Sequence, residues 1–289
     1  MEKNNEARGI LYLVATPIGN LEDMTYRAVR ILNEVDLIAA EDTRNSIKLL
    51  NHFEIKKPMT SYHEFNKYDK ADMLIDKLLA GESIAVITDA GTPGISDPGE
   101  VLADKAIASG IKVVPVPGAC AAVNGLIASG QPTRRFAFEA FLPTDKNERN
   151  DVLNELKNET RTMIIYEAPH RLKKTLVELS KVFGMDRSLT ICKELTKKYE
   201  NFYRTDFKGA IAMFEEEEAR GEYILVIKGK TFSEIKEEET KKWDDISITE
   251  HIDMYIKKGM SKKEAVKQVA SDRNMPKRDV YQESIGHDF

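Results

Sequence analysis

Short apolar runs alternate with amphipathic stretches along the first 120 residues. An amphipathic helix repeats its apolar positions every three or four residues, whereas a strand covered on both faces is apolar throughout. On this basis we predict strands at residues 10–15, 36–40, 58–63, 83–88 and 111–116, and helices at 25–33, 43–53, 70–80 and 100–109. Buried strands separated by helices form a parallel, doubly wound sheet, so this part is expected to be an α/β domain.

The alternation resumes near residue 131 with a second set of strands. These are expected at 136–141, 161–166, 187–195, 199–205 and 222–228, with helices at 145–158, 168–183 and 208–219. The third and fourth strands of this set are close enough in sequence to pair as a hairpin, which indicates a mixed sheet. We therefore predict two α/β domains, one over residues 1–120 with a parallel sheet and one over 121–230 with a mixed sheet.

The composition changes after Lys230. Residues 233–245 are rich in charge and have little apolar periodicity, which is typical of a linker. Three short helices are then expected at 248–257, 261–270 and 276–284, and Ser261 with Glu264 forms a capping box at the start of the second. We predict a small helix-turn-helix-like appendage over residues 231–289. Its basic side chains fit either a solvated surface, balanced by nearby acidic residues, or a contact with RNA: Lys257, Lys258, Lys262, Lys263, Lys267, Arg273, Lys277 and Arg278.

The predicted strand 83–88 ends in a loop of unusual composition, Thr88-Asp-Ala-Gly-Thr-Pro-Gly-Ile-Ser-Asp-Pro-Gly99. The next strand ends in a similar loop, Pro117-Gly-Ala-Cys-Ala-Ala122. Glycine lets backbone approach a ligand closely, and open α/β sheets bind ligands at the carboxyl ends of their strands. A tight turn with no ligand is the alternative.

Neither loop matches a known phosphate-binding motif, because G-x-G-x-x-G and the Walker pattern G-x-x-x-x-G-K-[ST] are both missing from the sequence. Proline has no N–H to donate to an anion, and Asp89 and Asp97 would repel a pyrophosphate. Such a loop would suit a ligand with ammonium, sulfonium or ribose hydroxyl groups.

The composition of the chain limits its partners and its location in the cell. The formal net charge of −5 argues against general coating of nucleic acid, although it allows a local basic patch. No apolar run approaches the length of a membrane span, and residues 1–8 do not resemble a signal peptide. Cys120 and Cys192 lie outside any metal-ligand spacing. We therefore expect a cytoplasmic protein with reduced thiols, no bound metal and no membrane association.

Five further motifs occur in a specific order with these loops. They are Leu13-Val-Ala-Thr-Pro-Ile-Gly-Asn-Leu-Glu-Asp23, Ala39-Ala-Glu-Asp-Thr-Arg44, Ser61-Tyr-His-Glu64, Phe141-Leu-Pro143 and Tyr166-Glu-Ala-Pro-His-Arg171. In this order they resemble the ribosomal RNA small-subunit methyltransferase I family of the tetrapyrrole methylase superfamily, over nearly the whole chain. The resemblance implies S-adenosyl-L-methionine bound in a cleft between the two α/β domains, a homodimer, and 2′-O-methylation of a cytidine in the decoding region of 16S rRNA.

The resemblance and the loop chemistry together indicate a set of cofactor-binding residues. Relatives more often have Gly-Asp-Pro where this chain has Gly91-Thr-Pro93, so the role of that aspartate does not carry over. The expected set is Pro17, Asp89, Gly91, Thr92, Pro93, Ile95, Ser96, Asp97, Pro117, Gly118, Ala119, Phe141, Leu142, Tyr166, Glu167 and Ala168.

The methyl acceptor would be a ribose hydroxyl, which is a weak nucleophile. Transfer therefore requires alignment with the sulfonium methyl and benefits from a base. The expected catalytic residues are Glu41, Asp42, Arg44, His63 and Glu167, with Glu64 as a further carboxylate at a strand end and Arg171 as a second clamp for an anion. Helix capping before Thr43 explains Glu41 and Asp42 equally well, and a structural role is the alternative for His63 and for His170. The sequence does not select one base.

Two other functions stay open. The first is methylation of a small tetrapyrrole by the same fold with the same cofactor. The second is a noncatalytic, ribosome-associated RNA-binding module. The charged helical appendage favours RNA over a tetrapyrrole, and the Gly/Pro loops at the strand ends favour an enzyme over a passive binder.

Overall fold

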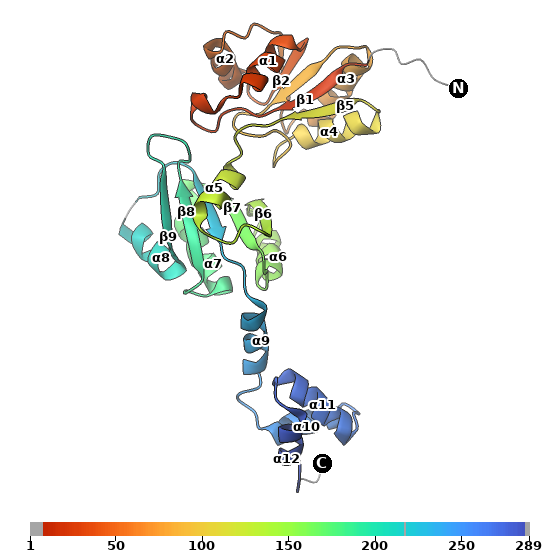
Figure 1. Ribbon diagram of the computed structural model, residues 1–289, viewed down its shortest axis with the longest axis vertical. Helices are drawn as coiled ribbons and strands as arrows, with labels where there is room; N and C mark the ends of the chain where they lie inside the picture. Colours follow the sequence, from red (N-terminus) through yellow and green to blue (C-terminus); the bar gives the residue numbers. More distant parts are fainter. Residues whose placement is uncertain (1–7, 217, 287–289) are drawn as a thin grey trace, which may run out of the picture. The chain divides into compact units, whose positions relative to one another are not determined.

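The computed structural model describes residues 8–216 and 218–286 (Figure 1). The chain divides into two compact units. The first contains the residues up to 154 together with 162–228, and the second contains 155–161 together with 229–289.

The first unit begins with a wholly parallel sheet of order β3-β2-β4-β1-β5. Its strands are β1 (Ile10–Val14), β2 (Leu37–Ala40), β3 (Met59–Ser61), β4 (Ile84–Ile87) and β5 (Lys112–Val116). The connecting helices are η1 (Leu21–Asp23), α1 (Tyr26–Glu34), α2 (Thr43–His52), α3 (Lys67–Leu79) and α4 (Gly99–Ala108). The predicted parallel sheet is confirmed.

Helices cover both faces of this sheet, which explains why its central strands are apolar throughout. Leu74 and Leu78 of α3 and Leu102 of α4 pack on one face. Residues of α1 and α2, among them Leu32 and Leu50, pack on the other. Because all five strands run in the same direction, their carboxyl ends meet at one edge of the sheet.

The second sheet of this unit has the order β6-β7-β10-β8-β9. Only β6 and β7 are parallel, so the predicted mixed sheet is also confirmed. The elements are α5 (Ala121–Ser129), β6 (Phe136–Phe141), α6 (Lys146–Leu156), β7 (Thr162–Glu167), α7 (Pro169–Phe183), β8 (Ser188–Lys193), β9 (Asn201–Asp206), α8 (Phe207–Glu216) and β10 (Tyr223–Ile227).

Two features of this sheet were not predicted. Helix α5 follows the loop after β5 directly, and its Ala122 and Leu126 pack on the second sheet against Ile164 and Cys192. Strand β6 contains a bulge between Phe138 and Ala140, where the pairing with β7 shifts. A bulge changes the direction of the side chains that follow it.

The second unit contains α9 (Phe232–Lys241), α10 (Ile248–Lys257), α11 (Lys262–Asp272) and α12 (Lys277–Glu283). The last three share a small core that includes Ile252, Val269 and Val280. The charge-rich stretch 233–245, predicted to be a linker, contains most of α9, a helix that the sequence analysis did not predict. A capping box of Thr231 and Glu234 starts this helix, and Glu and Lys favour helix even without an apolar face.

Helices of the length and apolarity required to cross a membrane do not occur in the described part of the chain.

Candidate active site

A cavity of about 340 Å³ lies in the first unit, at the ends of strands from both sheets. The loops after β1, β4 and β5 contribute Ile18, Gly91, Thr92 and Ile95 together with Ala90, Cys120 and Ala121. The second sheet and its loops contribute Phe141, Tyr166, Glu167, Ala168 and Pro169, with Cys192, Leu195, Glu222, Tyr223 and Ile224. The wall is mostly apolar, and its volume is in the range of pockets that hold small organic ligands.

Gly91 is held in position by the loop after β1. Its backbone pairs with Thr16, with N–H···O distances of 2.9 and 3.1 Å. Gly91 has φ +86°, and a Cβ there would lie 3.2 Å from Cγ2 of Ile18. The position therefore requires glycine for conformation and for space. Thr92 then joins this loop to the next, because its hydroxyl donates to the Ala119 carbonyl at 3.0 Å.

Asp97 folds the loop after β4. Its carboxylate accepts from the N–H groups of Gly94 at 2.9 Å, Gly99 at 2.7 Å and Ile95 at 3.3 Å. A carboxylate with three backbone partners is already satisfied. The acidic residue that the sequence suggested for a cationic ligand instead stabilises the turn that leads into α4.

Seven of the sixteen predicted cofactor residues line this cavity: Gly91, Thr92, Ile95, Phe141, Tyr166, Glu167 and Ala168. The other nine lie outside its wall: Pro17, Asp89, Pro93, Ser96, Asp97, Pro117, Gly118, Ala119 and Leu142. Gly118 and Ala119 instead line a neighbouring cavity of about 530 Å³, which Ile18 also borders.

Tyr166 is fixed at the boundary between the two sheets of the first unit. Its hydroxyl oxygen accepts from the N–H of Ala122 at 2.9 Å, which satisfies one of the free donors at the start of α5. Its ring packs edge-on against Phe138 and Phe141, with centroids 5.0 and 5.6 Å away. Burial raises the pKa of Tyr166 to about 12, so its hydroxyl stays neutral.

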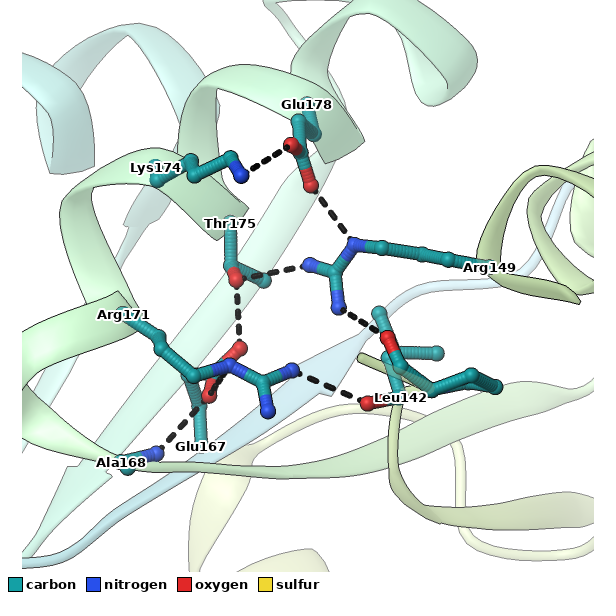
Figure 2. Close-up of polar contacts among 9 residues, drawn as sticks. Leu142, Arg149, Glu167, Ala168, Arg171, Lys174, Thr175 and Glu178 are labelled. Carbon is teal, nitrogen blue, oxygen red and sulfur yellow. Dashed lines mark hydrogen bonds and ion pairs between the residues drawn. The ribbon is translucent and has the colours of Figure 1, made fainter. Parts of the chain in front are cut away.

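Glu167 is held in a polar network at the end of β7 (Figure 2). Its buried carboxylate accepts from the N–H of Ala168 at 2.9 Å and from the hydroxyl of Thr175 at 2.5 Å. Arg171 Nε lies 3.2 Å from the same carboxylate, and the guanidinium also donates to the Leu142 carbonyl. Glu167 therefore borders the cavity with its carboxylate already engaged, which argues against its predicted role as a general base.

Glu41, Asp42 and Asp89 are brought together at the ends of β2 and β4. Glu41 accepts from the Thr88 hydroxyl at 2.5 Å and from the Asp89 N–H at 3.3 Å. Asp89 accepts in turn from the Asp42 N–H at 3.2 Å. This acidic cluster lies outside the wall of the cavity, on the same edge of the first sheet.

Asp42 caps α2 and pairs with Arg44, 2.7 Å away. The Arg44 hydrogen bonds lower the pKa of Asp42 to about 2, so this carboxylate is a weak base at neutral pH. The Arg44 side chain is 88% exposed, which leaves its guanidinium available to an anion. His63 lies one strand further along the edge, and its Nε2 is 3.3 Å from the Asn66 amide. In the part of the chain that the structure describes, no hydrogen bond or ion pair joins His63 to Glu41, Asp42, Arg44 or Glu167.

The cavity also contains residues that sequence reasoning missed. Ile18 belongs to the motif at residues 13–23 but was not assigned to the cofactor, whereas Leu195 and Glu222 come from strand ends without a distinctive motif, and only the fold brings them to the wall. Cys192 is buried, and burial raises the pKa of its thiol to about 12, so it is not a nucleophile. Groups of three or more His, Cys, Asp or Glu side chains that could hold a metal ion are not found among residues 8–216 and 218–286.

Comparison with protein families and solved structures shows the class of protein to which this chain belongs. The family model described as Tetrapyrrole (Corrin/Porphyrin) Methylases matches residues 10–210, which include the whole first sheet and every strand of the second sheet except β10. A crystal structure of diphthine synthase has the same fold, with a TM-score of 0.62 at 13% identity over 77% of this chain and 91% of that one.

Relatives with high sequence identity show the group within this family. Proteins called Ribosomal RNA small subunit methyltransferase I from Halalkalibacterium halodurans and Synechocystis sp. are 50% and 47% identical. The alignments cover 96% of this chain in both cases, and 96% and 98% of the relatives. The chain belongs to the tetrapyrrole methylase family and, within it, to the ribosomal RNA small subunit methyltransferase I group. The family, the fold class, the enzyme class and the methyl donor predicted from the sequence are thereby confirmed.

Proposed function

We propose that this protein transfers the methyl group of S-adenosylmethionine to the ribose 2′-oxygen of a cytidine in the decoding region of 16S rRNA. The observation that carries this proposal is the full-length relation to Ribosomal RNA small subunit methyltransferase I. The structure adds a cavity in which the two Gly/Pro loops meet the second sheet.

The residues present fit the cofactor. Gly91 keeps backbone close to the ligand space without a side chain, and Ile18, Ile95 and Phe141 supply apolar surface for its adenine and methylene groups. Glu222 lies at the wall with one carboxylate oxygen 2.9 Å from Lys197 Nζ, and its other oxygen can accept from the amino acid ammonium. When bound, the cofactor supplies an electrophilic methyl group on a sulfonium.

The acceptor side is expected at the acidic cluster and Arg44. The exposed guanidinium can hold a phosphate of the RNA backbone. Within the described residues, Asp42 is the carboxylate of the cluster that pairs with Arg44, whereas Glu41 and Asp89 accept from hydroxyl, amide or backbone donors. Holding the ribose hydroxyl in line with the methyl group supplies most of the rate, because residues 8–216 and 218–286 offer no buried, unengaged base in the wall of the cavity.

The proposed partner is the small ribosomal subunit or its 16S rRNA, which places the protein in the cytoplasm. A homodimer is also proposed, in line with the family resemblance. In support, Val123 and Ile127 on α5 are 46% and 66% exposed although both are apolar. Light scattering at working concentration tests the dimer.

The function is tested by methyl transfer from labelled S-adenosylmethionine to three acceptors: isolated small subunits lacking the modification, naked 16S rRNA, and a tetrapyrrole. We expect label in a 16S cytidine that becomes resistant to alkaline cleavage at its 3′ side. Label in the tetrapyrrole alone would support the small-molecule alternative. Cofactor or RNA binding without transfer to any acceptor would support a noncatalytic module.

A further inference from the structure

The second unit contains a cavity of about 420 Å³ between α11 and α12. Lys262, Lys263 and Val266 come from the first two turns of α11, and Lys277 and Tyr281 lie one turn apart on α12. Val266 is buried and belongs to the core of the unit, so the floor of this cavity is fixed. Lys262 fixes one side by donating to the Ser284 carbonyl at 3.2 Å.

Charge is divided unevenly along this unit. Residues 231–256 contain eight acidic and three basic side chains, whereas residues 257–284 contain eight basic and four acidic ones. Two of those four acidic groups are engaged inside the unit, Glu264 in a capping box and Asp272 with the Tyr255 hydroxyl. The cavity therefore lies in the basic part, where a polyanion is attracted.

Two of the lysines are available for a ligand. Lys263 and Lys277 are exposed, and neither forms an ion pair within the residues that the structure describes. Tyr281 is 56% exposed, so its ring forms a wall rather than part of the core. A pair of ammonium groups beside an exposed aromatic ring matches the two parts of a nucleotide, phosphate and base.

We propose that the cavity formed by Lys262, Lys263, Val266, Lys277 and Tyr281 binds unpaired RNA, with Lys263 and Lys277 on backbone phosphates and one base stacked on Tyr281. This proposal rests on the proposed function, since it names the part of the chain that holds the rRNA substrate outside the methyl-transfer site. A stacked base favours a single strand over a duplex, because paired bases are not exposed to an aromatic side chain.

The test uses the full-length protein, a fluorescein-labelled single-stranded oligoribonucleotide and its duplex. The pocket variant is Lys263→Ala/Lys277→Ala. Its control is Lys236→Ala/Lys241→Ala, which removes the same charge from exposed positions on α9. Tyr281→Ala is compared with Tyr281→Phe, which keeps the ring. Fluorescence of Trp243, which stacks on the buried His251 at 3.7 Å, reports whether each variant keeps the second unit folded.

Each lysine–phosphate contact adds about 0.7 to the salt slope of single-strand binding, so loss of two contacts should lower the slope by about 1.4. If the wild type and the pocket variant bind equally at 1 M salt, this difference in slope makes the variant bind about 25-fold more weakly than the wild type at 0.1 M salt. The control should retain both the slope and the affinity. Tyr281→Ala should weaken binding by roughly 5- to 150-fold, the range of base stacking, and Tyr281→Phe should not.

Equal losses in the pocket variant and the α9 control would overturn the proposal, since they would show a general charge effect. The proposal would also be overturned if the pocket variant lost binding to an acidic polypeptide such as polyglutamate but kept its affinity for RNA, because the pocket would then fit a protein partner. Methyl transfer to small subunits is measured in parallel. Transfer by the wild type with unchanged RNA affinity in the pocket variants refutes the pocket alone, whereas absence of transfer by the wild type refutes the proposed function.

Discussion

Replacing Glu167 by glutamine removes one negative charge from the end of β7 and keeps the side chain nearly the same size. The carboxylate is fully buried, and it accepts from the Ala168 N–H, the Thr175 hydroxyl and Arg171 (Figure 2). An amide has one acceptor oxygen and an NH₂ group that must face one of these donors. The variant therefore breaks the ion pair and loses at least one hydrogen bond.

The size of the loss follows from burial. Removing one partner of a buried ion pair costs about 3–5 kcal/mol, because the remaining charge is left uncompensated. The Arg171 side chain is 24% exposed and keeps its hydrogen bond to the Leu142 carbonyl, so the lower end applies. We expect Glu167→Gln to lower the free energy of unfolding by about 3 kcal/mol. Glu34→Gln, which breaks an exposed pair with Arg30, should cost about 0.5 kcal/mol or less.

Unfolding in urea, followed by circular dichroism, measures the stability of both variants. The turnover number for methyl transfer, measured with both substrates saturating below the unfolding transition, separates structure from catalysis. We expect kcat of Glu167→Gln to fall by less than about 10-fold, since removal of a general base typically costs about 100- to 10,000-fold. A stable Glu167→Gln protein with kcat reduced by 100-fold or more would refute the structural role and restore Glu167 as a catalytic base.

Three further predictions concern other parts of the chain. Gly91→Ala should weaken binding of S-adenosylmethionine by at least 10-fold in calorimetry, while Gly184→Ala, which has a similar positive φ and open space around it, should cost stability alone. Arg44→Ala should raise KM for RNA by about 10- to 150-fold, as expected for one charged hydrogen bond, without changing cofactor affinity, whereas the surface control Arg30→Ala should change neither. Burial and the nearby Arg273 lower the pKa of His251 below its ordinary value of 6.5. The stability that depends on a neutral His251 is therefore present above pH 6.5 and is lost as the pH falls below that value. Urea unfolding of the second unit, followed by the fluorescence of the single tryptophan, should lose up to about 1.4 kcal/mol per pH unit below that point; an unchanged midpoint between pH 7.5 and 5.5 would contradict this.

The sequence by itself determined the order of the strands, the order of the helices apart from η1, α5 and α9, and the loops that form the cavity. Local patterning suffices for this, because an apolar strand run and a helical period each depend on residues only a few positions apart. Gly91 illustrates this, since its positive φ belongs to a loop whose glycines and prolines lie within residues 88–99. The motifs that identify the family are also short runs of consecutive residues, so they could be recognised from the sequence.

The tertiary structure decided which polar groups are available for chemistry. Glu167 looked like a candidate base until Arg171 and Thr175, a turn or two further along α7, were found against its carboxylate. Residues 155–161 join the second unit although they are flanked by strands and helices of the first, and the buried Lys230 contacts the Asn158 side chain there. Contacts between distant parts of a chain depend on packing of whole elements, and no local pattern encodes them. The sequence therefore predicts where the site lies, and the fold determines which of its side chains are already engaged.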